Sequence, residues 1–235
     1  MKRATTRLAC AALTAAACAF AAPAAQADDL PIATDDTAAV ETTDVFTGET
    51  ATAEETAATK QTCTDPQLAN PLTAFKDQRS YFLAPGGDFE HSAAPGWELA
   101  GGATVVAGNE PFGVAGGGGS ALNLPAGSSA TSPVFCIDLN YPTFRFFAVQ
   151  AQEAADAGLQ VEVIYPELAS KNVRRAANLK AFKAWKLSND VKLQPQAAGK
   201  QAGWRKVALR FTVPATKKGG NWKIDGILVD PRCRY

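Results

Sequence analysis

Hydrophobic and polar residues alternate with a period of two along several short stretches in the later part of the chain. The clearest stretch is 204–213, where apolar side chains fall on one side and charged ones on the other: Val207, Leu209, Phe211 and Val213 against Lys206 and Arg210. Residues 143–149 and 159–165 repeat the pattern with aromatic and branched side chains. This alternation is typical of strands that bury one face.

Shorter stretches of the same kind follow one another between turns rich in Gly and Pro. We place them at 81–83, 97–100, 103–107, 121–124, 134–137, 181–187 and 222–229. About ten short strands in roughly 150 residues predict one all-β domain built as a two-sheet antiparallel sandwich. Within the last strand, Gly226 predicts a bulge that re-aims residues 227–229.

The first 27 residues have a different composition. A basic start with Lys2, Arg3 and Arg7 precedes an apolar stretch, 8–22, and an Ala-x-Ala site at 25–27. This order predicts a secretory signal peptide, so we expect an exported protein. A lipoprotein anchor at Cys18 is the weaker alternative, because the usual Leu is missing before it. No second long apolar run follows, so no membrane span is expected.

Charge is distributed unevenly, although the net charge is zero. Residues 28–62 are rich in Asp, Glu, Thr and Ala, which predicts a disordered acidic linker whose threonines could carry sugars. Residues 168–223, by contrast, contain fourteen Lys and Arg but one acid, Asp190. This basic half can be a site for an anionic partner, a solvated face, or a surface paired with the acidic linker. It does not by itself predict a nucleic-acid site.

Residues suited to catalysis are sparse. His91 is the one histidine, no nucleophile motif accompanies it, and no local pattern pairs two carboxylates as in a glycosidase. After export, Cys63, Cys136 and Cys233 remain, which allows one disulfide and one spare thiol. We therefore expect a protein that is not an enzyme, and a hydrolase of unrecognised type ranks last among the alternatives.

Aromatic side chains near the basic residues are the candidates for ligand binding. Trp185 and Trp204 could stack on a sugar ring, with Lys186, Lys206 and Arg210 beside them for acidic groups. Trp97 and Trp222 read instead as core residues. The expected partner is a cell-wall glycan or an anionic wall polymer.

Three stretches resemble a group of uncharacterised secreted proteins of actinobacteria. They are 85–112, 124–147 and 221–232, and the resemblance extends over most of the chain from Cys63 onward. It brings no known activity. Cysteines recur in that group at the places of Cys63 and Cys136, which implies a disulfide between these two residues and leaves Cys233 as the spare thiol.

A coarser resemblance is to jelly-roll carbohydrate-binding modules of the galactose-binding-like fold. It rests on "GDFE" at 87–90, followed by Gly96-Trp97, and on "WKIDGILV" at 222–229. It implies a structural calcium ion held by Glu90 and Asp225. The chain departs from the pattern at Gly226, where related modules often carry a second acid.

Together these observations predict a signal peptide at 1–27, a disordered linker at 28–62, and a β-sandwich domain at 63–235. We interpret the protein as a secreted, non-catalytic module that binds glycans or anionic cell-wall polymers. The alternative is a structural or protein-interaction module of the cell surface.

Overall fold

A computed structural model describes residues 62–91, 94–114, 118–152, 157–170, 172–180, 182–198, 203–216 and 219–230. All of them belong to one compact unit, Ala58–Tyr235. The predicted signal peptide, almost all of the predicted linker, and Cys233 lie outside the described residues.

The described chain forms short strands and two short 3-10 helices, η1 (Thr73–Phe75) and η2 (Pro195–Ala198). The strands are β1 (Phe82–Leu83), β2 (Glu98–Ala100), β3 (Thr104–Ala107), β4 (Ser120–Pro125), β5 (Ser129–Thr131), β6 (Phe135–Ile137), β7 (Thr143–Gln152), β8 (Leu159–Ile164), β9 (Val173–Leu179), β10 (Lys186–Leu187), β11 (Val191–Lys192), β12 (Arg205–Thr212) and β13 (Asn221–Asp230). No helix in this part of the chain is long and apolar enough to cross a membrane.

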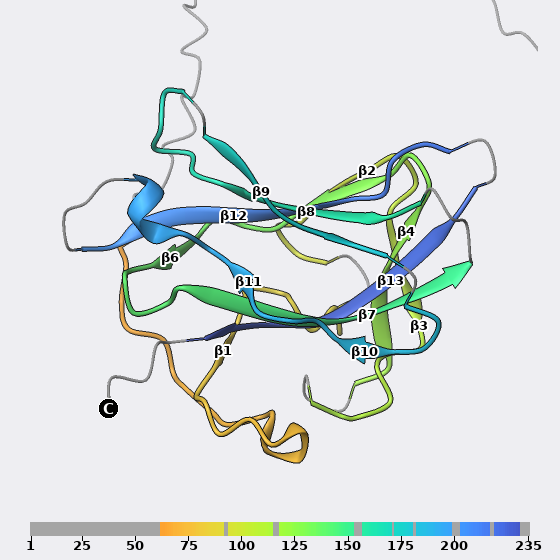
Figure 1. Ribbon diagram of the computed structural model, residues 1–235, viewed down its shortest axis with the longest axis horizontal. Helices are drawn as coiled ribbons and strands as arrows, with labels where there is room; N and C mark the ends of the chain where they lie inside the picture. The colour runs from red at the N-terminus through yellow and green to blue at the C-terminus, as the bar shows by residue number, and fades with distance from the viewer. Residues whose placement is uncertain are drawn as a thin grey trace, which may run out of the picture. The chain divides into compact units, whose positions relative to one another are not determined.

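The strands form two antiparallel sheets that lie one above the other (Figure 1). The seven-stranded sheet has the order β10-β7-β13-β4-β3, with β11 also paired to β7 and β1 to β13. The six-stranded sheet has the order β2-β5-β12-β8-β9, with β6 also paired to β12. From β4 onward the chain passes back and forth between the sheets, which is the connectivity of a jelly roll. The predicted all-β sandwich is confirmed.

The core lies between the sheets because the inward residues of the alternating strands meet there. Phe211 in β12 is fully buried and packs edge-on against Phe146 of β7, with ring centroids 5.1 Å apart. Trp222 is likewise fully buried, and Trp97 is 7% exposed, so both tryptophans are core residues as predicted. Each such side chain contributes about 1.5–3 kcal/mol by leaving water.

The long strand β13 contains the predicted bulge. Its register against β7 shifts between Asp225 and Leu228, and Gly226 has a φ of +57°. A left-handed backbone is inexpensive for glycine alone, which explains this residue at this position. The bulge turns Ile227 into the core and leaves Leu228 on the outer face.

Residues 62–80, which we call the strap, run along the outer face of the seven-stranded sheet before β1 (Figure 1). Beneath the strap lies a second apolar cluster of Leu72, Tyr81, Phe147, Leu187 and Leu228. The strap therefore gives the seven-stranded sheet an apolar cover on the side away from the main core.

A disulfide joins Cys63 at the start of the strap to Cys136 in β6. This is the pairing that the resemblance implied. Because β6 pairs with β12, the disulfide connects the strap to the six-stranded sheet.

Some elements differ from the predicted strands. The stretch 181–187 contains only β10, at Lys186–Leu187, and the sequence pattern did not predict β5, β9 or β11. β9 is an edge strand whose residues are exposed or half-buried, so it lacks the apolar alternation of the central strands.

Candidate functional site

The two predicted metal ligands lie at an acidic cluster beside the bulge in β13. Asp225 is 1% exposed, and its carboxylate accepts hydrogen bonds from the backbone N–H groups of Gly226 (2.7 Å) and Glu110 (3.2 Å). The carboxylate of Glu110, also 1% exposed, accepts backbone N–H groups of Phe112 and Val114. The buried acids therefore hold the loop after β3 against β13.

Glu90 forms the outer part of this cluster. Its carboxylate accepts the N–H of Gly119 at 2.9 Å, and a Cβ on Gly118 would lie 1.6 Å from its Cδ atom. Only glycine at 118 leaves room for the carboxylate in this position. Part of the glycine-rich stretch thus has a packing role against Glu90.

Burial raises the pKa of Asp225 to about 7, and the nearby charges of Glu110 and Glu90 act in the same direction. The two backbone N–H groups lower it, but by less. Carboxylate oxygens are the donors that Ca²⁺ prefers, so the chemistry of the cluster suits this ion. The described residues nevertheless contain no group of three or more His, Cys, Asp or Glu arranged to hold a metal ion. Calcium at Glu90 and Asp225 therefore stays a prediction.

The predicted ligand-binding residues are divided between the two sheets. Trp185 and Lys186 belong to the seven-stranded side, where Trp185 packs against the apolar cluster under the strap and Lys186 is exposed. Trp204 packs against the main core and stacks on Tyr141, with ring centroids 6.1 Å apart. The structure therefore does not bring the two tryptophans together into one aromatic face.

Lys206 and Arg210 lie on β12, in the centre of the six-stranded sheet. Arg210 donates to Glu162 of β8 at 2.7 Å. It belongs to a row of side chains that crosses five strands in register, in the order Glu98, Thr131, Arg210, Glu162 and Arg175. The outer face of this sheet is consequently polar.

A polar cleft of about 260 Å³ opens between β9 and the β10–β11 segment, where the edges of the two sheets meet. Its lining residues are Ala177, Asn178, Leu179, Lys180, Phe182, Ser188, Asn189, Asp190 and Val191. The ring of Phe182 lies 5.8 Å from that of the core residue Trp222 and carries the Lys186 ammonium group at 5.4 Å. The cleft thus combines an aromatic ring with amide, hydroxyl, carboxylate and ammonium groups.

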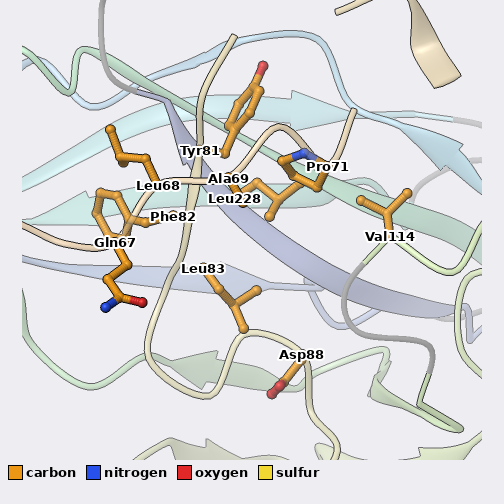
Figure 2. Close-up of a pocket in the computed structure, with 10 residues that line it drawn as sticks. All are labelled: Gln67, Leu68, Ala69, Pro71, Tyr81, Phe82, Leu83, Asp88, Val114 and Leu228. Atoms are coloured by element: carbon orange, nitrogen blue, oxygen red, sulfur yellow. The ribbon is translucent and has the colours of Figure 1, made fainter. Parts of the chain in front are cut away.

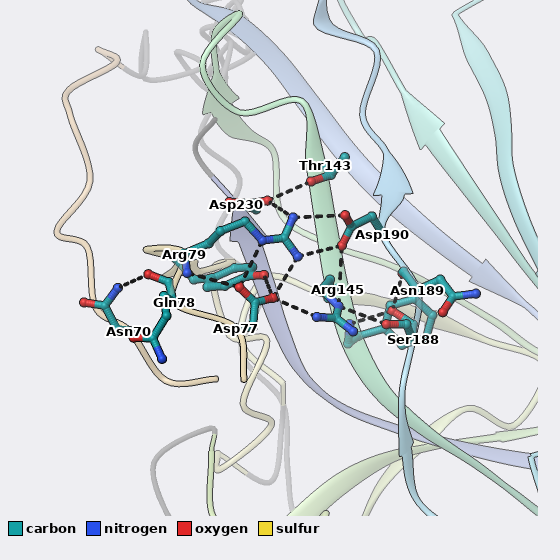
Figure 3. A network of polar contacts seen from close by, with 12 residues as sticks. Asn70, Asp77, Gln78, Arg79, Thr143, Arg145, Ser188, Asn189, Asp190 and Asp230 are labelled. Atoms are coloured by element: carbon teal, nitrogen blue, oxygen red, sulfur yellow. Dashed lines mark hydrogen bonds and ion pairs between the residues drawn. The ribbon is translucent and has the colours of Figure 1, made fainter. Parts of the chain in front are cut away.

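An ionic network centred on Arg79 of the strap lies beside this cleft (Figure 3). The guanidinium donates to Asp77 at 2.7 Å, to Asp230 at 2.6 Å and to both oxygens of Asp190 at 2.9 and 3.0 Å. Arg145 of β7 joins the same network through Asp77, at 2.8 Å. The network therefore ties the strap to β7, to the end of β13 and to the wall of the cleft.

Charge and burial act against each other within this network. Hydrogen bonds from Arg79 and Tyr81 hold the pKa of Asp77 well below its usual range, although its partial burial alone would raise it. Burial raises the pKa of Asp230 to about 6, because the attraction of Arg79 and the bond from Thr143 offset only part of the desolvation. One oxygen of Asp230, Oδ1, is buried with no partner, which agrees with the raised value.

A second hollow, about 440 Å³ in volume and lined mostly by apolar residue types, lies between the strap and β1 (Figure 2). It is lined by Gln67, Leu68, Ala69, Pro71, Tyr81, Phe82, Leu83, Asp88, Val114 and Leu228. Leu68 is 48% exposed at its rim. Ala69 and Tyr81 exchange two backbone hydrogen bonds at one end, of 2.8 and 2.7 Å, and the chain segments separate beyond them.

Sequence reasoning missed Arg79, Asp77 and the amide residues of the cleft. Asp190 was visible as the single acid of the basic half, and that isolation was a usable signal. Arg79 carried no such signal, because its partners in the cleft wall and in β13, Asp190 and Asp230, are 111 and 151 residues away along the chain.

No protein-family model matches the chain, and no curated protein matches it. Several solved structures can be superposed on part of the chain. The xylan-binding domain CBM22-1 of Paenibacillus barcinonensis Xyn10C is 14% identical, with a TM-score of 0.41 over 63% of this chain and 94% of that one. The K1 cleaved adhesin domain of Lys-gingipain from Porphyromonas gingivalis is 16% identical, with a TM-score of 0.41 over 62% and 96%. The family 11 carbohydrate-binding module of a Clostridium thermocellum cellulase is 13% identical, with a TM-score of 0.36 over 66% and 96%. Similarity at this level leaves the function to be argued from the chain's own residues.

Proposed function

We propose that this protein is an exported, non-catalytic module that binds a glycan in the polar cleft beside β9. The observation that carries the proposal is the lining of the cleft, which places amide and carboxylate groups around the ring of Phe182. Amide and carboxylate oxygens accept hydrogen bonds from sugar hydroxyl groups, and amide N–H groups donate to them. The part of the Phe182 ring that Lys186 and Trp222 leave uncovered adds apolar area to the lining.

The charges at the rim indicate which glycans fit. Lys180 lines the cleft, and the Lys186 ammonium group lies over the lining residue Phe182. Two ammonium groups at the cleft favour a glycan or wall polymer that carries carboxylate or phosphate groups. The volume of about 260 Å³ is just below the usual range of roughly 300–1,000 Å³ for small-molecule sites. We therefore expect the cleft to hold one or two units of a longer polymer.

Export and the absence of catalysis belong to the same proposal. A signal-peptide pattern at 1–27 and a disulfide between Cys63 and Cys136 both favour an oxidising compartment. The acids with raised pKa values, Asp225 and Asp230, are 1% and 2% exposed, so their carboxylates do not face a substrate. Their chemistry supports the fold instead.

The test is a glycan microarray of neutral and acidic oligosaccharides, followed by calorimetric titration of the strongest hit at low and high salt. We expect acidic glycans to bind and N178A or N189A to weaken binding about tenfold, the effect of losing one or two good hydrogen bonds. E98Q, at the opposite edge of the six-stranded sheet, is the matched control and should bind normally. An array without hits contradicts the glycan, and binding that survives both amide substitutions contradicts the site.

The apolar hollow next to β1 favours a second candidate, a protein-interaction module. Exposed Leu68 and Leu83 at this hollow offer apolar surface to a partner, with Asp88 nearby. L83D separates the two candidates, because it should weaken binding of a protein partner at this hollow and leave glycan binding in the cleft unchanged. Loss of glycan binding in L83D, with N178A unaffected, would instead move the glycan to this hollow.

A further inference from the structure

The strap and the polar cleft are connected, because two residues that line the cleft also contact the ionic network of the strap. Ser188 and Asp190 line the cleft. The same two residues contact the ionic network of the strap, which Figure 3 shows from close by. This double role connects the cover of the seven-stranded sheet with the proposed binding site.

The first connection is a two-point clamp between Arg79 and Asp190. Nη1 of Arg79 donates to Oδ2 of Asp190 at 2.9 Å, and Nη2 donates to Oδ1 at 3.0 Å. Two parallel bonds fix both the position and the plane of the carboxylate. The side chain of Asp190 is 45% exposed, and without the clamp only the longer ion pair to Arg145 Nε, at 3.6 Å, would hold it in the network.

The second connection runs through Arg145 of β7. Its Nη1 donates to Asp77 of the strap at 2.8 Å, and its Nε donates to the backbone carbonyl of Ser188 at 2.9 Å. Ser188 is bound to β7 a second time, because its Oγ accepts the N–H of Phe146 at 3.1 Å. One guanidinium therefore bridges the strap and the wall of the cleft.

We infer that Arg79 is a positioning residue for the cleft, and that closure of the strap and the binding-competent form of the cleft are one coupled state. With the strap in place, the clamp fixes the Asp190 carboxylate in the cleft wall, and each oxygen keeps a lone pair beyond its bond to Arg79 for a sugar hydroxyl. When the strap lifts, Arg79 leaves with it, and Asp190 keeps only the 3.6 Å ion pair to Arg145. The inference rests on the proposed function for the identity of the ligand, but the coupling of strap and cleft wall does not.

Linkage makes this coupling reciprocal. A ligand that binds the oriented Asp190 must stabilise the closed strap by the same factor by which the closed strap strengthens ligand binding. The network can be disrupted from either side. One substitution replaces Arg79 on the strap, and the other replaces Asp190 in the cleft wall.

The first arm of the test uses the full chain without ligand and measures hydrogen–deuterium exchange. We expect R79Q to speed exchange both in strap peptides covering 66–76 and in cleft peptides covering 186–192, by about tenfold. D190N, an exposed and conservative change, should speed exchange in the strap although it lies outside it. R210Q is the matched control, since it breaks an Arg–carboxylate pair on the other sheet. It should leave both segments unchanged.

Each outcome of this arm decides the inference. Faster exchange in both segments of both variants supports it. Faster exchange confined to the mutated segment, or equal changes in R210Q, overturns it. D190N keeps the test valid should R79Q fail to fold.

The second arm uses the strongest glycan from the microarray. We expect R79Q to weaken its binding about tenfold and saturating glycan to slow exchange in 66–76 of the wild type by a similar factor. Weaker binding in R79Q without slower exchange in the strap would overturn the coupling. An array without hits would contradict the proposed function alone, because the first arm judges the coupling without a ligand.

Discussion

The outer faces of the two sheets differ in chemistry. The outer face of the seven-stranded sheet carries an apolar patch beside its ionic network, and the patch residues Phe147, Leu187 and Leu228 are at most 7% exposed because the strap covers them. The outer face of the six-stranded sheet has a polar row from Glu98 to Arg175 whose members are half-buried or exposed. The seven-stranded sheet therefore needs a third layer, the strap, over its outer face, whereas the six-stranded sheet does not.

This difference explains where the ionic contacts are strong. The Arg210–Glu162 pair is on the uncovered face, with side chains 35% and 18% exposed. Under the strap, Arg79 contacts Asp230, whose side chain is 3% exposed. An ion pair near water contributes little, but removing one partner of a buried group leaves an uncompensated charge. Substitutions on the covered face should therefore lower the free energy of unfolding more than substitutions on the uncovered face.

The largest expected effect comes from the apolar layer beneath the strap. Phe147 is fully buried, and its ring lies 5.5 Å from Phe75 and 5.4 Å from Phe112. F147A should lower the free energy of unfolding by about 3–5 kcal/mol, because it removes the aromatic side chain and leaves a cavity. V173A, at a 37% exposed position of β9, should change it by less than about 0.5 kcal/mol. Urea unfolding measures both, and similar losses in the two variants would contradict the contrast between the faces.

A smaller effect is expected from pH, again on the covered side. The pKa of Asp230 is raised to about 6 from its ordinary 3.8, so the folded state holds a proton that the unfolded state has lost between these values. Stability from this group is therefore greatest at low pH and falls as the pH rises through 6. The loss from pH 5 to pH 7 should be about 1 kcal/mol. Asp77 acts in the opposite sense, because its pKa is lowered, and its contribution is lost below about pH 4.

Two variants isolate this pH dependence. D230N should remove about 1 kcal/mol of the change between pH 5 and pH 7, as followed by urea unfolding at several pH values, and leave the part that comes from Asp225, whose pKa is raised to about 7. E162Q removes a carboxylate from the uncovered face and should keep the wild-type slope. A slope that D230N leaves intact would place the titrating group elsewhere.

The smallest effect concerns the acidic cluster of Glu90, Glu110 and Asp225. If calcium binds there as the resemblance implies, 1 mM free Ca²⁺ should stabilise the protein by about 0.4–1.4 kcal/mol, given the roughly 10⁻⁴–10⁻³ M affinities of extracellular modules. This corresponds to a rise in Tm of roughly 1–6 °C. E90Q should abolish the rise, and Mg²⁺ should not reproduce it. A wild-type Tm that excess chelator leaves unchanged would remove calcium from this site.

The central strands could be predicted from the sequence because their burial follows from local alternation. In β12 and β8 every second residue is apolar, and these residues are the ones that the structure buries. The strands β5, β9 and β11 escaped prediction since they are short or lie at an edge, where burial comes from neighbours and not from the strand's own pattern. For the same reason, only Lys186–Leu187 (β10) of the predicted strand at 181–187 forms a strand.

The candidate site was predictable only in part. The basic half contains most of the residues that line the proposed cleft, and Lys186 lies over the cleft residue Phe182. The stacking pair of Trp185 and Trp204 did not converge, because a strand pattern gives the face of each side chain but not the sheet to which the strand belongs. Which strands become neighbours depends on long-range pairing.

The sequence by itself determined the all-β class, the bulge at Gly226 and the core tryptophans, because each depends on residue type and on spacing within one strand. The resemblance added the pairing of Cys63 with Cys136. The tertiary structure alone decided that residues 62–80 cover one sheet, and that Arg79 reaches Asp190 and Asp230 across more than a hundred residues of chain. Such contacts come from the order in which strands pack, and no local pattern encodes that order.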